Sequence, residues 1–280
     1  MQLDENLITR VLQALGVRRG PPDVALLDAL VATYVRRVPW ESAFRIAKRA
    51  RTTRTQDCPR WPDEFWSDAL ERGGGGTCFE SNYAFLTLLQ ALDFEGDLTI
   101  NDMQETAGCH TAIIVRLGGQ RWLVDGGYPL HVPLLLADVP TERESAIHTY
   151  RAEPDGAGKY TITRDRHPEP YVFTLIDQPV DEATYRAALQ ADYGPDGLFL
   201  DRVVIVKVVD EQLWRFNSGE PPAHLQRFAD GERSNTLIEG AAAERLAAHF
   251  GLDRAVVQAA FDALKQPNET ASRSGSSTSS

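Results

Sequence analysis

Four consecutive glycines, residues 73–76, stand directly before a stretch that is apolar on almost every side. An apolar surface all round is typical of a helix buried within a core, and we expect this helix to reach Leu92. Thr77 and Glu80 have the spacing of a capping box, with Thr77 as the N-cap. The pattern therefore predicts that Cys78 occupies the first position of a buried helix.

Cys78 is well placed for nucleophilic chemistry. The unpaired amides and the dipole of a helix start favour a thiolate there, and the glycines leave the approach free of side chains. The alternative is that Cys78 is a small buried hydrophobic residue, as most intracellular cysteines are. A reactive role requires a base nearby.

A predicted hairpin supplies that base. Two β-rich runs, residues 111–117 and 120–124, flank a Gly-Gly pair at 118–119, which is a common two-residue hairpin loop. With this loop, His110 and Asp125 lie on the same sheet face as diagonal neighbours, about 7–8 Å apart at the backbone. Each residue alone is compatible with a structural role, His110 at a strand end and Asp125 in a turn.

The three residues together indicate a catalytic triad. A thiolate beside an imidazolium that a carboxylate holds is a known nucleophile. We expect the Cys78 Sγ atom within about 4 Å of one His110 ring nitrogen, and the other nitrogen hydrogen-bonded to Asp125.

Three motifs resemble those of the arylamine N-acetyltransferases. Residues 75–82 read GGTCFESN, and the family's nucleophile motif is typically Gly-Gly-x-Cys-Phe-Glu-x-Asn. Residues 123–128, LVDGGY, are similar to the family's aspartate motif. Residues 38–42, VPWES, resemble its Pro-Phe-Glu-Asn signature. The resemblance covers residues 30–130 well and the rest in outline.

The resemblance implies an α+β fold around a core like that of cysteine proteases and transglutaminases. Its parts are an N-terminal helical bundle, a central antiparallel β-barrel and a C-terminal α/β lid. We expect a helical domain with the nucleophile Cys at 1–95, a β-barrel domain with His and Asp at 96–200, and the lid at 201–265. The Ser- and Thr-rich residues 266–280 are expected to be a disordered tail.

Sequence patterns give further expected elements. Helices are expected near residues 8–15, 23–37, 181–190, 240–250 and 253–264; strands at 171–176, at a hairpin around 154–158, and as a last pair at 203–209 and 213–216.

The activity that the resemblance implies is N-acyl transfer by a ping-pong mechanism. Cys78 takes an acyl group, expected to be acetyl, from a coenzyme A thioester and passes it to an arylamine or similar amine. No cofactor is expected to be bound permanently, because acetyl-CoA or another acyl thioester acts as co-substrate. Gly126, Gly127 and Tyr128 are the expected donor-binding residues, and the Cys78 amide is a candidate oxyanion donor.

Two other enzyme classes use the same chemistry. An amide synthase of natural-product biosynthesis takes its acyl group from an acyl carrier protein, and a transglutaminase-like enzyme or cysteine amidohydrolase applies the triad to amides. A non-catalytic binding module would leave an intact triad without a purpose. The chain departs from the family at Gly74, where an arginine is usual. We expect the nearby Arg72 to take that role and pair with Glu41.

Composition limits the partners. A net charge of −11 argues against nucleic acid and anionic membranes as partners. The partners that the resemblance implies are a small-molecule amine and an acyl thioester. The cysteines Cys58, Cys78 and Cys109 have no metal or disulfide spacing, which suits the reducing cytoplasm. Cys109 adjoins His110 in a strand and is expected to face the other way, as a structural residue. No signal peptide, membrane span or metal site is expected.

Overall fold

Five helices precede the first long strand in the part of the chain that the computed structural model describes, residues 3–265. They are α1 (Glu5–Leu15), α2 (Val24–Arg37), α3 (Ala43–Arg51), α4 (Pro62–Arg72) and α5 (Cys78–Ala91), with a 3-10 turn at Thr55–Asp57. Asp4 starts α1 by accepting hydrogen bonds from two free backbone amides, and Asp23 starts α2 by accepting one, from the Leu26 amide. Both helices were predicted, α1 from its apolar stripe and α2 at residues 23–37.

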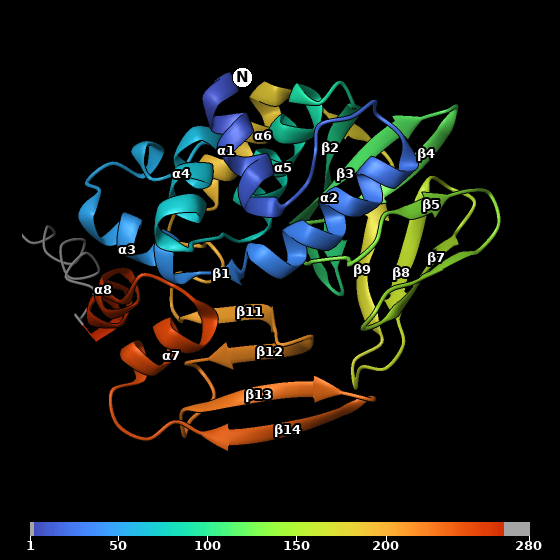
Figure 1. Cartoon of the computed structure of the whole chain (residues 1–280). Helices are drawn as coiled ribbons and strands as arrows, with labels where there is room; N and C mark the ends of the chain where they lie inside the picture. The colour runs from blue at the N-terminus through green and yellow to red at the C-terminus, as the bar shows by residue number, and fades with distance from the viewer. Residues whose placement is uncertain (1–2, 266–280) are drawn as a thin grey trace, which may run out of the picture.

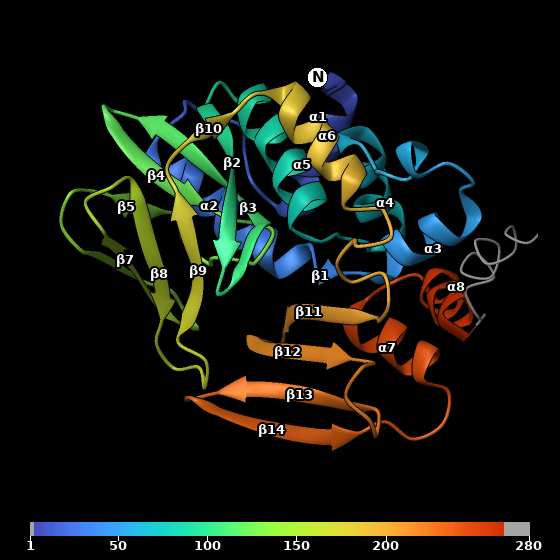
Figure 2. The same ribbon diagram turned by 180° about the vertical axis from the view of Figure 1, so that it is seen from behind.

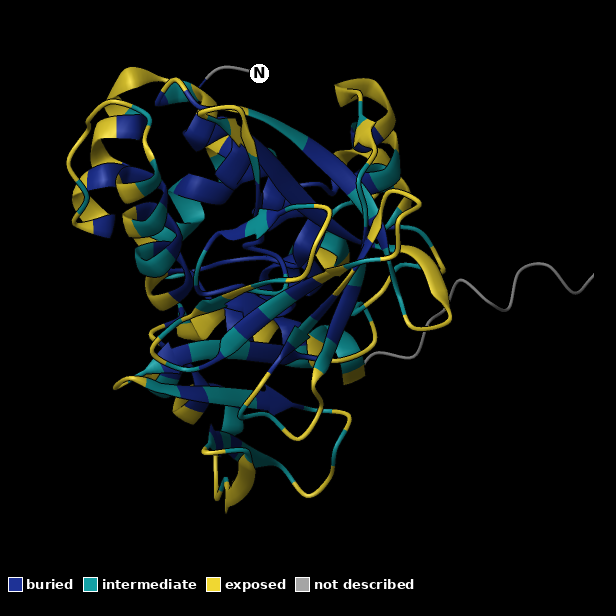
Figure 3. Cartoon of the chain, turned by 90° about the vertical axis from the view of Figure 1, so that its right-hand side faces the viewer, coloured by how far each residue is buried: buried dark blue, intermediate teal, exposed yellow. Residues whose placement is uncertain are grey.

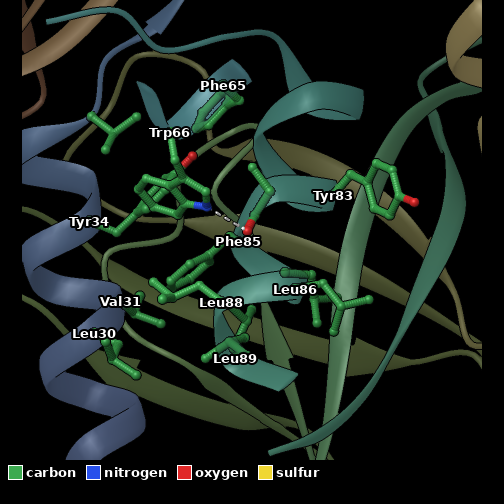
Figure 4. Packing of buried hydrophobic residues seen from close by; sticks show 14 of the residues in the cluster. Leu30, Val31, Tyr34, Phe65, Trp66, Tyr83, Phe85, Leu86, Leu88 and Leu89 are labelled. Carbon is green, nitrogen blue, oxygen red and sulfur yellow. Dashed lines mark hydrogen bonds between the residues drawn. The ribbon is translucent and has the colours of Figure 1, made fainter. Parts of the chain in front are cut away.

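Helix α5 forms the centre of the helical part, as expected from its all-round apolar sequence. Every residue from Cys78 to Leu89 is buried. In Figure 4, Tyr34 of α2 stacks on Phe85 at a centroid distance of 4.4 Å, and the Trp66 indole donates a hydrogen bond of 3.0 Å to the Ala84 carbonyl. Because neighbours surround α5 on all sides, its first residue has a fixed position.

The helix starts at Cys78 as predicted, but the predicted capping box is wrong. The Thr77 side chain makes no cap hydrogen bond. Its hydroxyl oxygen instead accepts a bond of 2.6 Å from Arg45, and Glu80 pairs with Arg60 at 2.5 Å. Two buried guanidinium groups need acceptors more strongly than two backbone amides do, and they take both side chains.

An antiparallel, nearly closed, barrel-like sheet follows the helices (Figures 1 and 2). Its strand order is β5-β4-β3-β2-β9-β8-β7-β6, and β10 also pairs with β2. The strands are β2 (Glu95–Met103), β3 (Thr106–Leu117), β4 (Gln120–Val124), β5 (Leu134–Leu136), β6 (Thr141–Glu144), β7 (Thr149–Pro154), β8 (Lys159–Arg164), β9 (Tyr171–Ile176) and β10 (Pro179–Val180). The hairpins predicted around residues 118–119 and 154–158 are both present.

Strand β3 is buried on both faces. Ile113 and Val115 belong to the core shared with the helices, whereas Ala112 and Ile114 belong to the core of the barrel. Because side chains alternate along a strand, His110 falls on the barrel side with Ala112. The burial colours in Figure 3 show strands in dark blue and teal, whereas many of the connecting loops are yellow and exposed.

The chain leaves the barrel through α6 (Glu182–Ala191) and forms a second sheet of order β1-β11-β12-β13-β14. Its strands are β1 (Trp40–Glu41), β11 (Val204–Val209), β12 (Gln212–Asn217), β13 (His224–Ala229) and β14 (Glu232–Leu237). Helices α7 (Ala242–Phe250) and α8 (Arg254–Lys265) pack beside it (Figure 1). Trp40 of β1 lies opposite Val206 and also bridges Gly76, so β1 joins this sheet to the glycine run.

The prediction that β11 and β12 are the last strands is wrong, since β13 and β14 follow them. Every residue of β14 is exposed, so the strand lacks the alternation that a half-buried strand shows. Within residues 3–265, no helix is long and apolar enough to cross a membrane. The domain boundaries stay predictions, and the predicted tail at 266–280 lies outside the described residues.

Candidate active site

His110 and Asp125 meet as the hairpin predicted. Their register follows from Leu117 lying opposite Gln120 across the Gly-Gly loop. His110 Nε2 and Asp125 Oδ2 are 2.7 Å apart, and both side chains are buried. Nδ1 is therefore the ring nitrogen left to face a substrate or a thiol.

The Asp125 carboxylate is held by further donors. Its Oδ1 atom accepts hydrogen bonds from Asn82 Nδ2 at 3.0 Å, from the Gly127 amide at 2.7 Å and from the Tyr128 amide at 3.0 Å. One oxygen thus receives three N–H groups and the other faces the imidazole. These hydrogen bonds fix the plane of the carboxylate.

Asn82 joins the nucleophile helix to the turn after β4. Its Oδ1 atom accepts a hydrogen bond of 2.8 Å from the Gly126 amide, and its Nδ2 atom donates one of 2.6 Å to the Thr111 carbonyl. The sequence motif contains Asn82, but sequence reasoning gave it no role. The signal was its position one helical turn after Cys78, on the side of the helix that also presents the thiol.

Cys78 packs against the same turn. The Thr111 hydroxyl donates a 3.0 Å hydrogen bond to the Cys78 carbonyl, and the Sγ atom lies 3.6 Å from the Cys109 carbonyl oxygen. Gly127 touches Cys78 so closely that a β-carbon there would overlap it. Cys78 and His110 line one cavity; the approach of Sγ to within about 4 Å of the ring stays a prediction.

The electrostatics differ from the sequence expectation of a helix-stabilised thiolate. Burial raises the pKa of the Cys78 thiol, and the carboxylates of Asp192 and Asp125 raise it further, whereas Arg45 lowers it. The raised pKa favours the thiol over the thiolate at Cys78. Its proton must pass to a base before or during attack.

The glycine run is anchored by Arg60. This buried guanidinium pairs with Glu80 at 2.5 Å, donates a 2.6 Å bond to the Gly75 carbonyl and lies 4.0 Å from Glu41. Glu41 in turn accepts a 3.2 Å bond from the Gly75 amide. Burial raises the pKa of Glu41, and Arg60 opposes that rise. Helix α5 and β1 are thereby tied to the loop before the thiol.

The predicted Glu41–Arg72 pair is wrong. Arg72 ends α4 and pairs with Asp68 and Asp253, each at 3.3 Å. Gly73 ends the helix in a left-handed conformation, and the chain beyond it reaches Glu41 through the Gly75 amide, while the Arg72 side chain stays with Asp68 and Asp253. Arg60 fills the place instead. Sequence reasoning missed it because Arg60 lies in a loop with no periodic pattern, far from the cysteine along the chain.

A cavity of about 460 Å³ opens at the thiol, between the barrel and the second sheet. Cys78, His110, Gly127 and Tyr128 line it. Gly126, expected beside them, does not line it and packs against the Tyr34 ring instead.

Cys109 also lines the cavity, which corrects the prediction that it faces away. Within residues 3–265, no group of three or more His, Cys, Asp or Glu residues could hold a metal ion.

Comparison with known proteins identifies the family. A sequence model of an N-acetyltransferase family matches residues 23–253, whereas no curated protein matches the chain significantly. The fold resembles an arylamine N-acetyltransferase of Mycobacterium smegmatis, at 19% identity and a TM-score of 0.75, with 94% of this chain and 100% of that chain covered. A Mycobacterium marinum arylamine N-acetyltransferase in complex with CoA has 18% identity and a TM-score of 0.76, with 92% and 99% covered.

A third similar structure comes from Bacillus cereus and is described by a Cys-His-Glu catalytic triad. It has 16% identity and a TM-score of 0.68, with 90% of this chain and 100% of that chain covered. The present chain has Asp125 beside His110. The family match spans most of the chain, and the helices and barrel agree with it. The chain therefore belongs to the arylamine N-acetyltransferase family of enzymes.

Proposed function

We propose that the protein transfers an acetyl group from acetyl-CoA through Cys78 to an arylamine or similar small amine, by a ping-pong mechanism. The observation that carries this proposal is a buried thiol in the same cavity as an imidazole that a fixed carboxylate holds. Family membership supports acetyl transfer, and the M. marinum enzyme was solved with CoA bound.

In the first half-reaction, His110 Nδ1 accepts the thiol proton as Sγ attacks the thioester carbonyl. The carbon–sulfur bond to Cys78 forms, and the bond to the CoA sulfur breaks. The leaving sulfur takes the proton from the imidazolium. Asp125 stabilises that imidazolium and holds Nδ1 toward the thiol. The Cys78 amide at the helix start donates to the oxyanion.

In the second half-reaction, an amine attacks the acetyl-Cys78 thioester. The carbon–nitrogen bond forms, His110 accepts a proton from the amine, and the Cys78 thiolate leaves and is reprotonated. The thiol has a raised pKa, so the protonated product form is favoured once the acetyl group has left. One sulfur cannot carry donor and product acyl groups at once, which is why the two substrates react in turn.

Gly127 and Tyr128 are the proposed contacts of the donor's acyl end, since both line the cavity next to the nucleophile. The Tyr128 ring stands edge-on to His110 at a centroid distance of 6.3 Å. It closes the space in which an acetyl group sits, so Tyr128→Ala is expected to speed the reaction of longer acyl chains relative to acetyl. An unchanged chain-length preference would remove Tyr128 from this role.

Intact-protein mass spectrometry after incubation with acetyl-CoA alone tests the proposal. One acetyl group is expected, on Cys78, and Cys78→Ala abolishes it. Cys109→Ala is the matched control, because it removes the neighbouring thiol in the same cavity and is expected to leave loading intact. Addition of an arylamine then discharges the acetyl group much faster than water does.

Three outcomes contradict the proposal. Loading that survives Cys78→Ala and is lost with Cys109→Ala would reassign the nucleophile. Loading from an acyl carrier protein but not from acetyl-CoA would indicate an amide synthase. Amide cleavage without any thioester loading would indicate an amidohydrolase.

A further inference from the structure

Arg164 differs from the other buried arginines in residues 3–265. Arg45 and Arg60 are almost fully buried, and each pairs with a carboxylate, Arg45 with Asp192 at 2.6 Å and Arg60 with Glu80 at 2.5 Å. Arg164 is only 9% exposed, yet it forms no ion pair with any described carboxylate. A buried charge without a partner is costly, and proteins seldom keep one without a use.

Neutral groups hold the Arg164 guanidinium in place. Nη2 donates to the Tyr128 hydroxyl at 3.1 Å and to His167 Nδ1 at 3.1 Å, and Nε donates to the Glu169 carbonyl at 3.3 Å. The group also lies over the Tyr128 ring, 5.3 Å from its centroid. Among the described residues, Nη1 has no hydrogen-bond partner. The guanidinium is thus oriented but not neutralised.

The histidines beside Arg164 add no positive charge of their own near pH 7. Burial lowers the pKa of His148 to about 4, and the Arg164 charge lowers it further. The same two causes lower the pKa of His167 to about 3. Both rings are neutral near pH 7, and both line the cavity. Arg164 is therefore a buried positive charge in the cavity wall that its own neighbours do not neutralise, whereas Arg202 and Arg215, which line the same cavity, pair with Asp201 and Glu220.

Arg164 lies one aromatic ring away from the reacting groups. Tyr128 stands between it and His110, with its ring centroid 5.3 Å from the Arg164 Cζ atom and 6.3 Å from the His110 centroid. All three residues line the cavity that holds Cys78. A small aromatic or short-chain substrate that reacts at the thiol can place its far end at Arg164.

We propose that Arg164 binds a carboxylate carried by the small-molecule substrate that reacts at Cys78, which makes the enzyme selective for carboxylated substrates. This inference rests on the proposed function. A planar guanidinium suits a carboxylate, because two parallel N–H groups match its two oxygens. Either the amine or the acyl group can carry the carboxylate, and the experiment separates the two sources.

The acceptor arm compares 4-aminobenzoate with 4-aminobenzamide, which has a similar shape without the charge. With acetyl-CoA as donor, kcat/KM is measured for both amines in the wild type and in Arg164→Gln. The substitution is expected to reduce the preference for the benzoate about tenfold to hundredfold, the range of a hydrogen bond to a charged group. Arg202→Gln is the matched control, since Arg202 lines the same cavity but already pairs with Asp201. It is expected to leave the preference unchanged.

The acyl arm omits the amine. Intact-mass measurements follow the loading of Cys78 by succinyl-CoA and by butyryl-CoA. These two acyl groups differ only at the far end, which is a carboxylate in succinyl and a methyl group in butyryl. If the wild type prefers succinyl-CoA and Arg164→Gln removes that preference, the carboxylate belongs to the acyl group. A preference confined to the acceptor arm assigns it to the amine.

A binding measurement separates this inference from the proposed function. Benzoate and benzamide are titrated calorimetrically into the wild type, Arg164→Gln and Arg164→Lys. Binding of benzoate is expected to be about tenfold tighter than that of benzamide, with Lys retaining more of the difference than Gln. A wild type that does not load acetyl but prefers benzoate sinks the proposed function alone. The role of Arg164 is overturned if the wild type shows no preference for the carboxylated compound in any pair, in binding or in kinetics. This result needs no variant, so it holds whether or not the Arg164 variants fold.

Discussion

Replacing Asp125 by Asn tests whether the carboxylate sets the proton position on His110. Three N–H groups point at Oδ1, and only an oxygen can accept from them. The Asn side chain must therefore place its oxygen there and its NH₂ group opposite His110 Nε2. That NH₂ group donates, so Nε2 must lose its proton and the ring proton moves to Nδ1. His110 then presents a donor to the thiol and cannot take its proton.

The size of the effect follows from this wrong tautomer. An equivalent Asp-to-Asn exchange in a serine protease triad lowers kcat about 10⁴-fold. We expect the rate of acetyl loading to fall about 10³- to 10⁴-fold, which is about 4 to 5.5 kcal/mol of activation free energy. Folding stability should change little, because the side chain keeps its shape and every N–H donor keeps its acceptor.

Single-turnover loading by acetyl-CoA, quenched with acid and read by intact mass, measures the rate directly. Asp125→Glu is the matched control: it keeps the charge, and a Cys-His-Glu triad is described for the B. cereus enzyme. It should load faster than the Asn variant. If Asp125→Asn unfolds at the wild-type temperature and loads within about tenfold of the wild-type rate, the tautomer argument fails.

Four further substitutions test the surroundings of the site. Arg60→Met leaves Glu80 buried without its cation and should lower the free energy of unfolding by about 3–5 kcal/mol in urea titrations. Arg72→Met breaks partly exposed ion pairs and should lower the free energy of unfolding by less than about 1 kcal/mol. Equal losses in the two variants would contradict the assignment of Arg60, rather than Arg72, as the anchor of the glycine run. His148 is neutral when folded, with a pKa of about 4, and titrates near 6.5 when unfolded. Stability should therefore fall with pH below about 6.5, by about 1 kcal/mol between pH 7.5 and 5.5 from this residue, and His148→Gln should flatten that slope. Gly127→Ala should abolish loading through overlap with the nucleophile while the protein stays folded, and normal loading would refute the close packing.

Local rules were enough to predict the parts of the site that depend on local geometry. The Gly-Gly loop sets the hairpin register, and the register alone brings His110 to Asp125. The all-round apolar sequence of α5 predicts its burial, and the preceding glycine run marks its start at Cys78. Each of these inferences needs only a few neighbouring residues.

Contacts between distant segments could not be predicted in the same way. Arg60 and Glu80 pair because the loop before α4 folds onto α5, and no nearby pattern records that contact. Once paired, Glu80 is no longer available to cap the helix, so a local motif gives way to a tertiary ion pair. The raised pKa of Cys78 has a similar origin, since it depends on burial and on Asp192 from after α6.

Strand β1 has a consequence for how the protein matures during synthesis. It contains two residues, yet it pairs with β11 and, through Trp40, bridges Gly76 next to the nucleophile. Ser42 adds hydrogen bonds to Val204 and Arg202. A ribosome delivers Cys78, His110 and Asp125 well before β11. A growing chain therefore carries all three proposed triad residues while the glycine loop before Cys78 still lacks its edge partner and the cavity lacks one wall. Such late, long-range pairing is slow to form. Acetyl loading should consequently be detectable only after β11 has paired with β1. A chain that ends before Val204 would contain the triad residues but lack the complete cavity around them.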